Sequence, residues 1–208
     1  MGSAVFFVSR KRIDNPLDLL YNYNQKTLYF YVEKGDVMIL KDREIILRAI
    51  EEQDAPLYHT LINDPQMEEM VVGWSFPVSM AQQLEWIRNQ HKDPRNQRYT
   101  VELDGTAVGM ASLTDIDHKN GVCELNIKLA DTAKGKGVGT RVIKLLLSYC
   151  FDQLNMNCVT AEILDYNIPS QKLFEKCGMK QEGVLRQRVY KNGAYHSLFV
   201  YSILKSEF

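Results

Sequence analysis

The chain has 208 residues, of which 45% are hydrophobic and 25% charged, and its formal net charge is −1. These values are typical of one soluble globular domain, and they provide no overall field for binding nucleic acid or an anionic membrane. No apolar run is long enough for a transmembrane helix, and residues 4–8 are too few for a signal-peptide core. The four cysteines form no C-x-x-C pair and do not cluster with the histidines, which predicts reduced thiols in a cytoplasmic protein without a metal site.

Residues 1–37 are predicted to be a segment distinct from the domain at residues 38–208. This segment is rich in tyrosine, and residues 27–32 have the composition of an edge strand. Lys34-Gly35-Asp36 precedes Met38 and can be encoded by a purine-rich ribosome-binding sequence. One hypothesis is therefore a translated leader with the native start at Met38. The alternative is an accessory segment that packs on the sheet.

From residue 38 onward the hydrophobic pattern alternates between strand and helix periods. Asp54 and Ser79 are predicted helix N-caps, and Ser79 forms a capping box with Gln82. Asn192-Gly193 is the strongest hairpin signal. The expected elements are strands at 44–48, 98–103, 107–114, 122–129, 158–164, 180–190 and 195–204, with helices at 54–61, 79–91, 138–152 and 170–178. This order predicts an α/β (α+β) fold with a mixed, mostly antiparallel central sheet and helices on both faces.

The most informative stretch is a half-buried strand at 122–129, a glycine-rich turn and an amphipathic helix at 138–152. Glycines allow the backbone to approach a ligand closely, and the first N–H groups of a helix attract anions. The turn carries three glycines and three interleaved basic residues: Gly135, Gly137, Gly139, Lys134, Lys136 and Arg141. It predicts a site for a di- or triphosphorylated molecule. The alternative is a solvated basic turn that only caps the helix.

The glycine spacing fits neither the Walker A loop nor the Rossmann fingerprint. Residues 134–139 instead resemble the acetyl-CoA pyrophosphate loop of the GNAT superfamily of N-acetyltransferases, Gln/Arg-x-x-Gly-x-Gly/Ala. Asn167 and Ser170, followed by residues 173–179, resemble a second family segment. Residues 182–186 and 190–195 resemble the branch that contains ribosomal-protein N-terminal acetyltransferases and spermidine acetyltransferases. The resemblance extends over residues 45–204 and implies the GNAT fold.

The resemblance implies acetyl-CoA as co-substrate, no metal, and an amine as acceptor. The implied acetyl-CoA site combines the end of the central strand, the glycine turn and the second segment. Its residues are Ile127, Lys128, Leu129, Lys134, Gly135, Lys136, Gly137, Val138, Gly139, Thr140, Asn167 and Ser170.

Removing a proton from an alkyl ammonium of pKa ~10.4 at neutral pH costs about 4–5 kcal/mol. Glu124 is the first candidate for proton acceptor, acting through water, because many family members have an acid on this strand. The alternative is that Glu124 pairs with a lysine or arginine on an adjacent strand. Phe174 stands where the family usually has a tyrosine acid, and Tyr166 and Cys177 are nearby substitutes that also suit packing. Tyr166 is the second candidate catalytic residue.

The predicted function is acetyl transfer to a primary amine, with a protein or peptide N-terminus favoured as acceptor. Trp74, Phe76 and Trp86 are candidates for the wall of its pocket. One alternative is a polyamine acceptor, which would require carboxylates such as Glu51, Glu52, Asp54, Asp64, Glu68, Glu69 and Glu85. Another, motivated by Phe174, is a non-catalytic acyl-CoA-binding module. The expected partners are acetyl-CoA and the amine, without nucleic acid or membrane, and a homodimer is left open.

Overall fold

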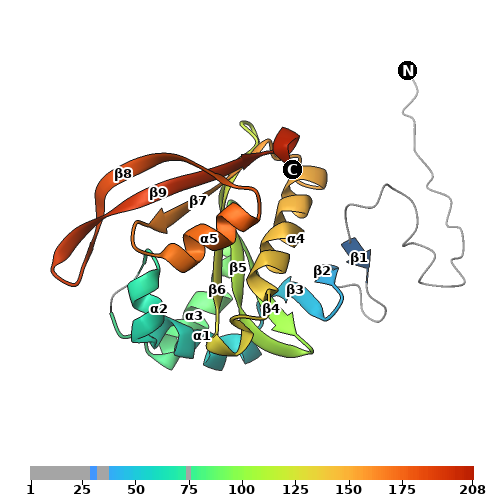
Figure 1. The fold of residues 1–208 in the computed structure, drawn as a ribbon. Coiled ribbons are helices and arrows are strands. Elements are labelled where there is room, and N and C mark those ends of the chain that lie inside the picture. The colour runs from blue at the N-terminus through green and yellow to red at the C-terminus, as the bar shows by residue number, and fades with distance from the viewer. Residues whose placement is uncertain (1–28, 32–37, 74–75) are drawn as a thin grey trace, which may run out of the picture.

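The computed structural model describes residues 29–31, 38–73 and 76–208 (Figure 1). Within these residues nine strands form one sheet in the order β1-β2-β3-β4-β5-β6-β7-β9-β8. Their bounds are β1 Tyr29–Tyr31, β2 Met38–Asp42, β3 Ile45–Ala49, β4 Gln97–Leu103, β5 Thr106–Asp117, β6 Val122–Leu129, β7 Cys158–Leu164, β8 Lys180–Lys191 and β9 Ala194–Leu204. The helices are α1 Ala55–Asn63, α2 Pro65–Met70, α3 Met80–Arg88, α4 Val138–Asp152 and α5 Ile168–Lys176.

The sheet is interrupted at its middle. Within the described strands, β6 and β7 are parallel and every other neighbouring pair is antiparallel. The parallel register contains three pairs, Val122 with Cys158, Cys123 with Val159 and Glu124 with Thr160. Beyond Glu124 the two strands separate, so the second half of β6 has a strand neighbour on the β5 side alone.

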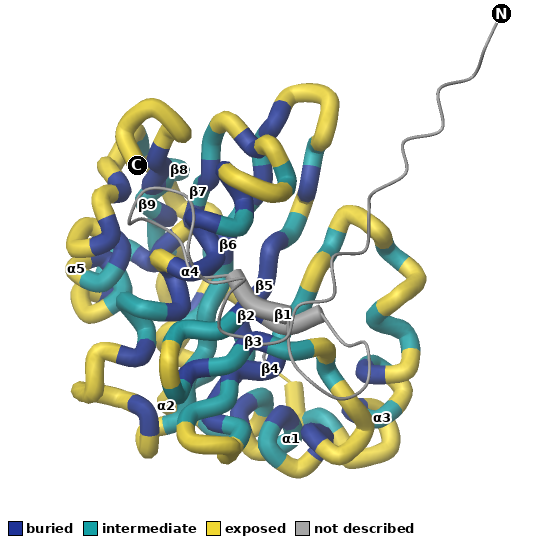
Figure 2. Tube along the Cα trace, turned by 90° about the vertical axis from the view of Figure 1, so that its right-hand side faces the viewer, coloured by how far each residue is buried: buried dark blue, intermediate teal, exposed yellow. Residues whose placement is uncertain are grey.

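Helices cover both faces of the sheet. Alternation along β6 directs Cys123 and Leu125 into the main core, where they meet the apolar stripe of α4. The opposite face is covered by α1 and α3, which contribute Tyr58, Leu61 and Ile87 to a second, smaller cluster. Buried positions gather along the central strands in Figure 2. The predicted mixed, mostly antiparallel sheet with helices on both faces is confirmed.

Part of the N-terminal prediction is also confirmed, because Tyr29–Tyr31 forms the edge strand β1 and pairs with β2. Residues 1–28 and 32–37 lie outside the described residues, and so does the predicted leader. The domain boundary before residue 38 and the native start at Met38 stay predictions.

Two details of the helix boundaries differ from the sequence prediction. Asp54 occupies the N-cap position of α1 as predicted, but its side chain makes no capping hydrogen bond to that helix: its carboxylate is buried and accepts hydrogen bonds from Arg48 at 2.7 and 2.8 Å and from Thr100 at 2.8 Å. The helix predicted at 54–61 is followed by a second helix, α2, because Asp64 accepts from the Gln66 N–H at 2.8 Å and caps the segment that begins at Pro65. In the first case, Arg48 of β3 and Thr100 of β4 bind the carboxylate, and the tolerance of proline in a first helical turn explains the second.

Other local predictions are confirmed. Ser79 and Gln82 form the capping box at the start of α3. Asn192 and Gly193 have φ values of 51° and 82°, as the tight β8–β9 turn requires.

Candidate active site

The separated half of β6 presents unpaired backbone groups. The Ala130 N–H donates to the Val108 carbonyl at 2.8 Å, and the β5–β6 register is constant from Gly109 opposite Leu129 onward. In an antiparallel ladder alternate residues bond to the same neighbour, so Lys128 directs its backbone groups toward β5. Ile127 and Leu129 direct theirs to the other side, which β7 has left. These peptide groups can therefore pair with an extended ligand.

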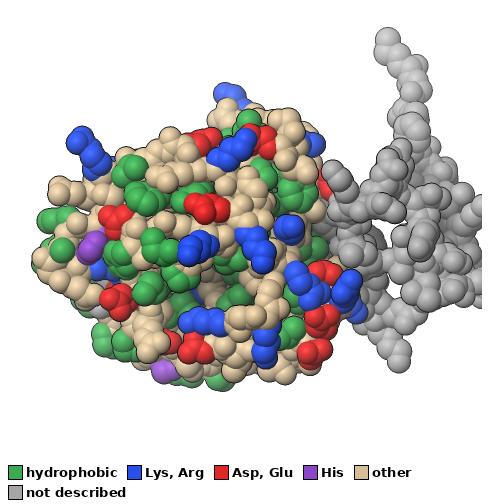
Figure 3. All heavy atoms as spheres, viewed as in Figure 1, with side chains coloured by type: hydrophobic (Ala, Val, Ile, Leu, Met, Phe, Trp, Pro, Cys, Tyr) green, Lys and Arg blue, Asp and Glu red, His purple; other side chains and the backbone are tan. Residues whose placement is uncertain are grey.

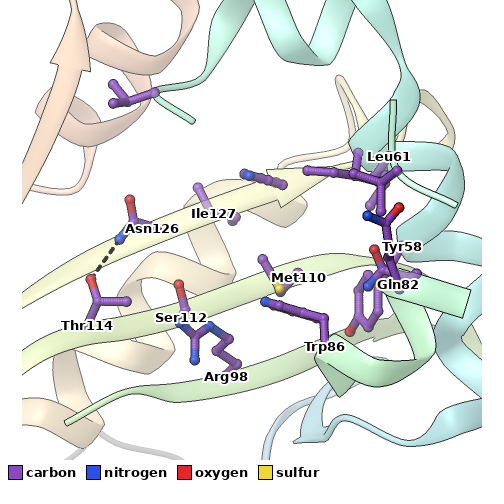
Figure 4. Close-up of a pocket in the computed structure, with 15 residues that line it drawn as sticks. Tyr58, Leu61, Gln82, Trp86, Arg98, Met110, Ser112, Thr114, Asn126 and Ile127 are labelled. Atoms are coloured by element: carbon purple, nitrogen blue, oxygen red, sulfur yellow. Dashed lines mark hydrogen bonds between the residues drawn. The ribbon is translucent and has the colours of Figure 1, made fainter. Parts of the chain in front are cut away.

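Two cavities adjoin this half of β6. The smaller, of about 220 Å³, lies between the separated strands, and the residues around it include Glu124, Asn167, Ser170 and Phe174. The larger, of about 570 Å³, lies on the face covered by α1 and α3 (Figure 4). The two cavities share four of their lining residues, Val72, Asn126, Ile127 and Lys128. The two cavities therefore adjoin along residues 126–128.

The glycine turn leaves the start of α4 open. Gly135 and Gly137 have φ values of 74° and 73°, and a Cβ on either would meet no atom of the described chain within 4 Å. The first helical bond joins the Arg141 N–H to the Gly137 carbonyl at 3.2 Å, so the N–H groups of residues 138–140 have no acceptor within the helix. Gly139 has another role, since a Cβ there would lie 3.1 Å from Leu173 Cδ2 of α5. Two glycines shape the turn, and the third allows close helix packing.

The basic residues of the turn differ in their partners. Lysine and arginine side chains gather on the face that carries α4 and α5 (Figure 3). Lys134 pairs with Asp131, and Lys136 makes no ion pair within the described part of the chain. Arg141 binds the carboxylates of Asp42 and Glu44, so it ties α4 to the β2–β3 hairpin instead of facing the turn.

Replacement of Arg141 should therefore affect folding more than ligand binding. We expect Arg141→Gln to lower Tm by roughly 2–4 °C, less at 1 M salt, and to change acetyl-CoA affinity by less than about threefold. Lys136→Gln is the matched control, with unchanged Tm and affinity reduced about three- to tenfold. Thermal melts and calorimetry measure both quantities. A tenfold loss of affinity in Arg141→Gln at unchanged Tm would contradict the assignment.

Glu124 lies on the same face of β6 as Asn126 and Lys128 and is half-buried. In the described residues it forms no ion pair, so its alternative role as the partner of a lysine or arginine has no support. Burial raises the pKa of its carboxyl, the carboxylates of Glu162 and Asp115 raise it further, and a hydrogen bond from Asn126 opposes them. A carboxylate with a raised pKa is a stronger base than an ordinary one.

The raised pKa has a consequence for stability. Folding favours the protonated carboxyl, so the fold loses stability as the pH rises from the unfolded-state pKa through the folded-state pKa of Glu124. We expect Glu124→Gln to raise Tm by roughly 2–4 °C at pH 8 and to have little effect near pH 4. Melting curves between pH 4 and pH 8 measure this difference. If Glu124→Gln is no more stable than the wild type at pH 8, the negative charge of the Glu124 carboxylate is compensated by other groups of the folded protein.

The downstream predicted residues occupy distinct positions. Asn167 is 6% exposed, accepts from the Ser170 N–H at 3.1 Å and donates to the Met70 carbonyl at 2.7 Å, so it caps α5 and holds α2 against it. Tyr166 lies outside the residues that line the two cavities, and its hydroxyl donates to the Glu69 carbonyl at 2.7 Å. Burial raises the pKa of Cys177 to about 11, and its thiol points to the Thr140 carbonyl.

The structure adds residues that sequence reasoning did not select. Arg98 lines the larger cavity beside Trp86, the aromatic residue predicted for its wall. Trp74 lies outside the described residues, and Phe76 is 68% exposed. Arg98 lies two residues before the buried Thr100 and so shares its face of β4, a signal that the Arg98 side chain points inward.

A mixed sheet split at a parallel pair, with a glycine-rich helix start beside the split, defines an acetyltransferase class of fold. Residues 44–180 match the family model described as the acetyltransferase (GNAT) domain, so the chain belongs to the GNAT family of N-acetyltransferases. In the described residues no helix is long and apolar enough to cross a membrane.

Three comparisons illustrate the similarity. The chain is 29% identical over 164 residues to the SPbeta prophage-derived uncharacterized N-acetyltransferase YokL of Bacillus subtilis, covering 79% of this chain and 92% of YokL. A crystal structure of spermidine N-acetyltransferase from Vibrio cholerae with CoA and spermine has a TM-score of 0.74 and 25% identity, covering 80% and 98% of the two chains. A RimL ribosomal L7/L12 α-N-protein acetyltransferase with CoA has a TM-score of 0.74 at 18% identity, covering 80% and 97%. RimL thus supports the fold alone.

Proposed function

We propose that this N-acetyltransferase transfers the acetyl group of acetyl-CoA to the N-terminal α-amine of a protein or peptide. The observation that supports it best is the separation of β6 from β7 between two cavities, one bordered by the start of α5 and one under α1 and α3. Acetyl-CoA supplies a thioester carbonyl as the electrophile. The chain's own residues bind the two substrates, orient them and accept the amine proton.

The residues present fit acetyl-CoA. The turn offers unpaired N–H groups on residues 138–140 and open space at Gly135 and Gly137, which suits a pyrophosphate with Lys134 and Lys136 at its rim. The free peptide groups of Ile127 and Leu129 suit the amides of pantetheine, beside the side chain of Lys128. Asn167 and Ser170 form the facing wall.

Glu124 is the proposed proton acceptor, acting through water. It lines the smaller cavity two residues before Asn126, where the two cavities begin to share their lining. The raised pKa of its carboxyl increases its basicity. A thiol of pKa ≈ 8.5 leaves as thiolate at pH 7 at a cost of about 2 kcal/mol, so the reaction tolerates Phe174 in place of an acid. Tyr166 stays a prediction as a second catalytic residue, and its position outside both cavities does not favour that role.

The charges around the larger cavity favour a peptide over a polyamine. The residues that line it include no aspartate or glutamate in the described chain. Three carboxylates considered for a polyamine site are paired elsewhere, Glu52 with Arg88, Asp54 with Arg48, and Glu68 with Lys191. A polyamine remains the second candidate, since the Vibrio cholerae relative is a spermidine acetyltransferase.

The test is release of CoA from acetyl-CoA with spermidine and with peptides bearing free Ala, Ser or Met N-termini, followed by mass spectrometry of the products. We expect acetylated peptides. Turnover of spermidine while every peptide stays unmodified would overturn the proposed acceptor. Tight acetyl-CoA binding without turnover of any amine would favour the non-catalytic module.

A further inference from the structure

We infer that the larger cavity selects a peptide whose first two residues include an acidic side chain, and that Arg98 binds its carboxylate. This inference rests on the proposed function and specifies its acceptor. The observation behind it is the guanidinium of Arg98, which is half-buried, lines the cavity and has no anionic partner among the described residues.

Arg98 is positioned by β4 and by Trp86 of α3. Its guanidinium carbon lies 5.7 Å from the centre of the Trp86 ring, which itself packs edge-on against Tyr58 at 6.1 Å. No ion pair or hydrogen bond of this guanidinium occurs among the described residues. Asp93 acts on it electrostatically, but the Asp93 carboxylate binds Asn96 and the Arg95 N–H. Burial of a charge without a partner is unfavourable, so a carboxylate ligand would stabilise it.

Lys128 adds a second basic group where the two cavities adjoin. Burial lowers the pKa of its ammonium group, and the nearby Lys191 lowers it further. Lys191 is neutralised by Glu68, whereas Lys128 has no carboxylate partner in the described part of the chain. The cavity thus combines the Arg98 cation with the basic side chain of Lys128 and no carboxylate among its described lining residues, which disfavours a polyamine and attracts an anion.

The strand register places Arg98 at a suitable distance from the transfer point. Arg98 pairs with Ser112 on β5, and Ser112 pairs with Asn126 on β6, so the three form one row across adjacent strands. With strands ~4.8 Å apart, Arg98 starts about 10 Å from β6. Figure 4 shows Arg98, Ser112 and Thr114 together at one end of the cavity, with Trp86 beside them. A peptide whose α-amine lies at β6 can therefore place a side-chain carboxylate, a few bonds from that amine, at Arg98.

The test compares kcat/KM for peptide pairs that differ by one charge: Ser-Asp against Ser-Asn, and Asp against Asn as the first residue. We expect the wild type to favour the acidic member roughly tenfold or more. Arg98→Gln should reduce that ratio to about one, chiefly by losing activity on the acidic peptide, whereas Arg98→Lys keeps part of it. Arg95→Gln is the matched control, because Arg95 is 67% exposed outside the cavity and its loss should leave the ratio unchanged.

The outcomes separate this inference from the proposed function. A wild-type ratio near one, or an unchanged ratio in a folded Arg98→Gln or Arg98→Lys variant, overturns the inference while peptide acetylation stands. Acetylation of spermidine alone overturns both. If Arg98→Gln melts well below the wild type, Arg98→Lys decides the result.

Discussion

Glu124→Gln is expected to lower kcat/KM at pH 7 by about 10²–10⁴, the usual contribution of a positioned general base. The carboxylate lines the cavity between β6 and β7 and has no cationic partner in the described chain, so its loss removes a base and no ion pair. The defect should shrink as the pH approaches the pKa of the amine, where free amine is abundant. A loss of constant size from pH 6 to pH 10 would instead mark Glu124 as a structural residue.

Glu162→Gln provides the matched control for this experiment. Glu162 is exposed on β7, lines the same cavity and raises the pKa of Glu124 through charge repulsion. Its replacement should retain activity within about tenfold and shift the acidic limb of the pH–kcat/KM profile to lower pH, because Glu124 then ionises more readily. If the acidic limb of the profile does not shift, a group other than Glu124 determines its position.

Gly137→Val is expected to weaken acetyl-CoA binding by roughly 10²-fold or more. The new side chain would project into the open space before α4, where the unpaired N–H groups lie, and each charge-assisted bond lost there is a strong one. A β-branched residue at a φ of 73° also strains the backbone by about 1–2 kcal/mol. Calorimetry with acetyl-CoA and thermal melts measure the two effects.

Gly105→Val separates strain from binding. Gly105 lies in the β4–β5 turn with a φ of 74°, and an added Cβ there also meets no described atom within 4 Å. This variant should lose a similar amount of stability and keep its affinity. Equal losses of affinity in the two variants would remove the glycine turn from the acetyl-CoA site.

Features with a local cause could be predicted from the sequence. The glycines of the turn, the Ser79 capping box and the Asn192-Gly193 hairpin depend on backbone conformation within a few residues. The same holds for β6, whose alternation shows which residues share a face. These features were sufficient to predict the fold class and a phosphate-binding turn, whereas acetyl-CoA as its ligand and Glu124 as the candidate base were expectations from the resemblance to the GNAT family.

Features that depend on partners distant in the chain were decided by the tertiary structure. Arg141 appeared to belong to the turn until the β2–β3 hairpin brought Asp42 and Glu44 to it. The Asp54 side chain appeared to cap α1, whereas in the fold it binds Thr100 of β4 as well as Arg48 of β3. The absence of a carboxylate around the larger cavity, in the described residues, and the position of Arg98 there likewise follow from packing. A sequence pattern gives the face of an element on which a charge lies, but the charge's partner is set by which elements pack together.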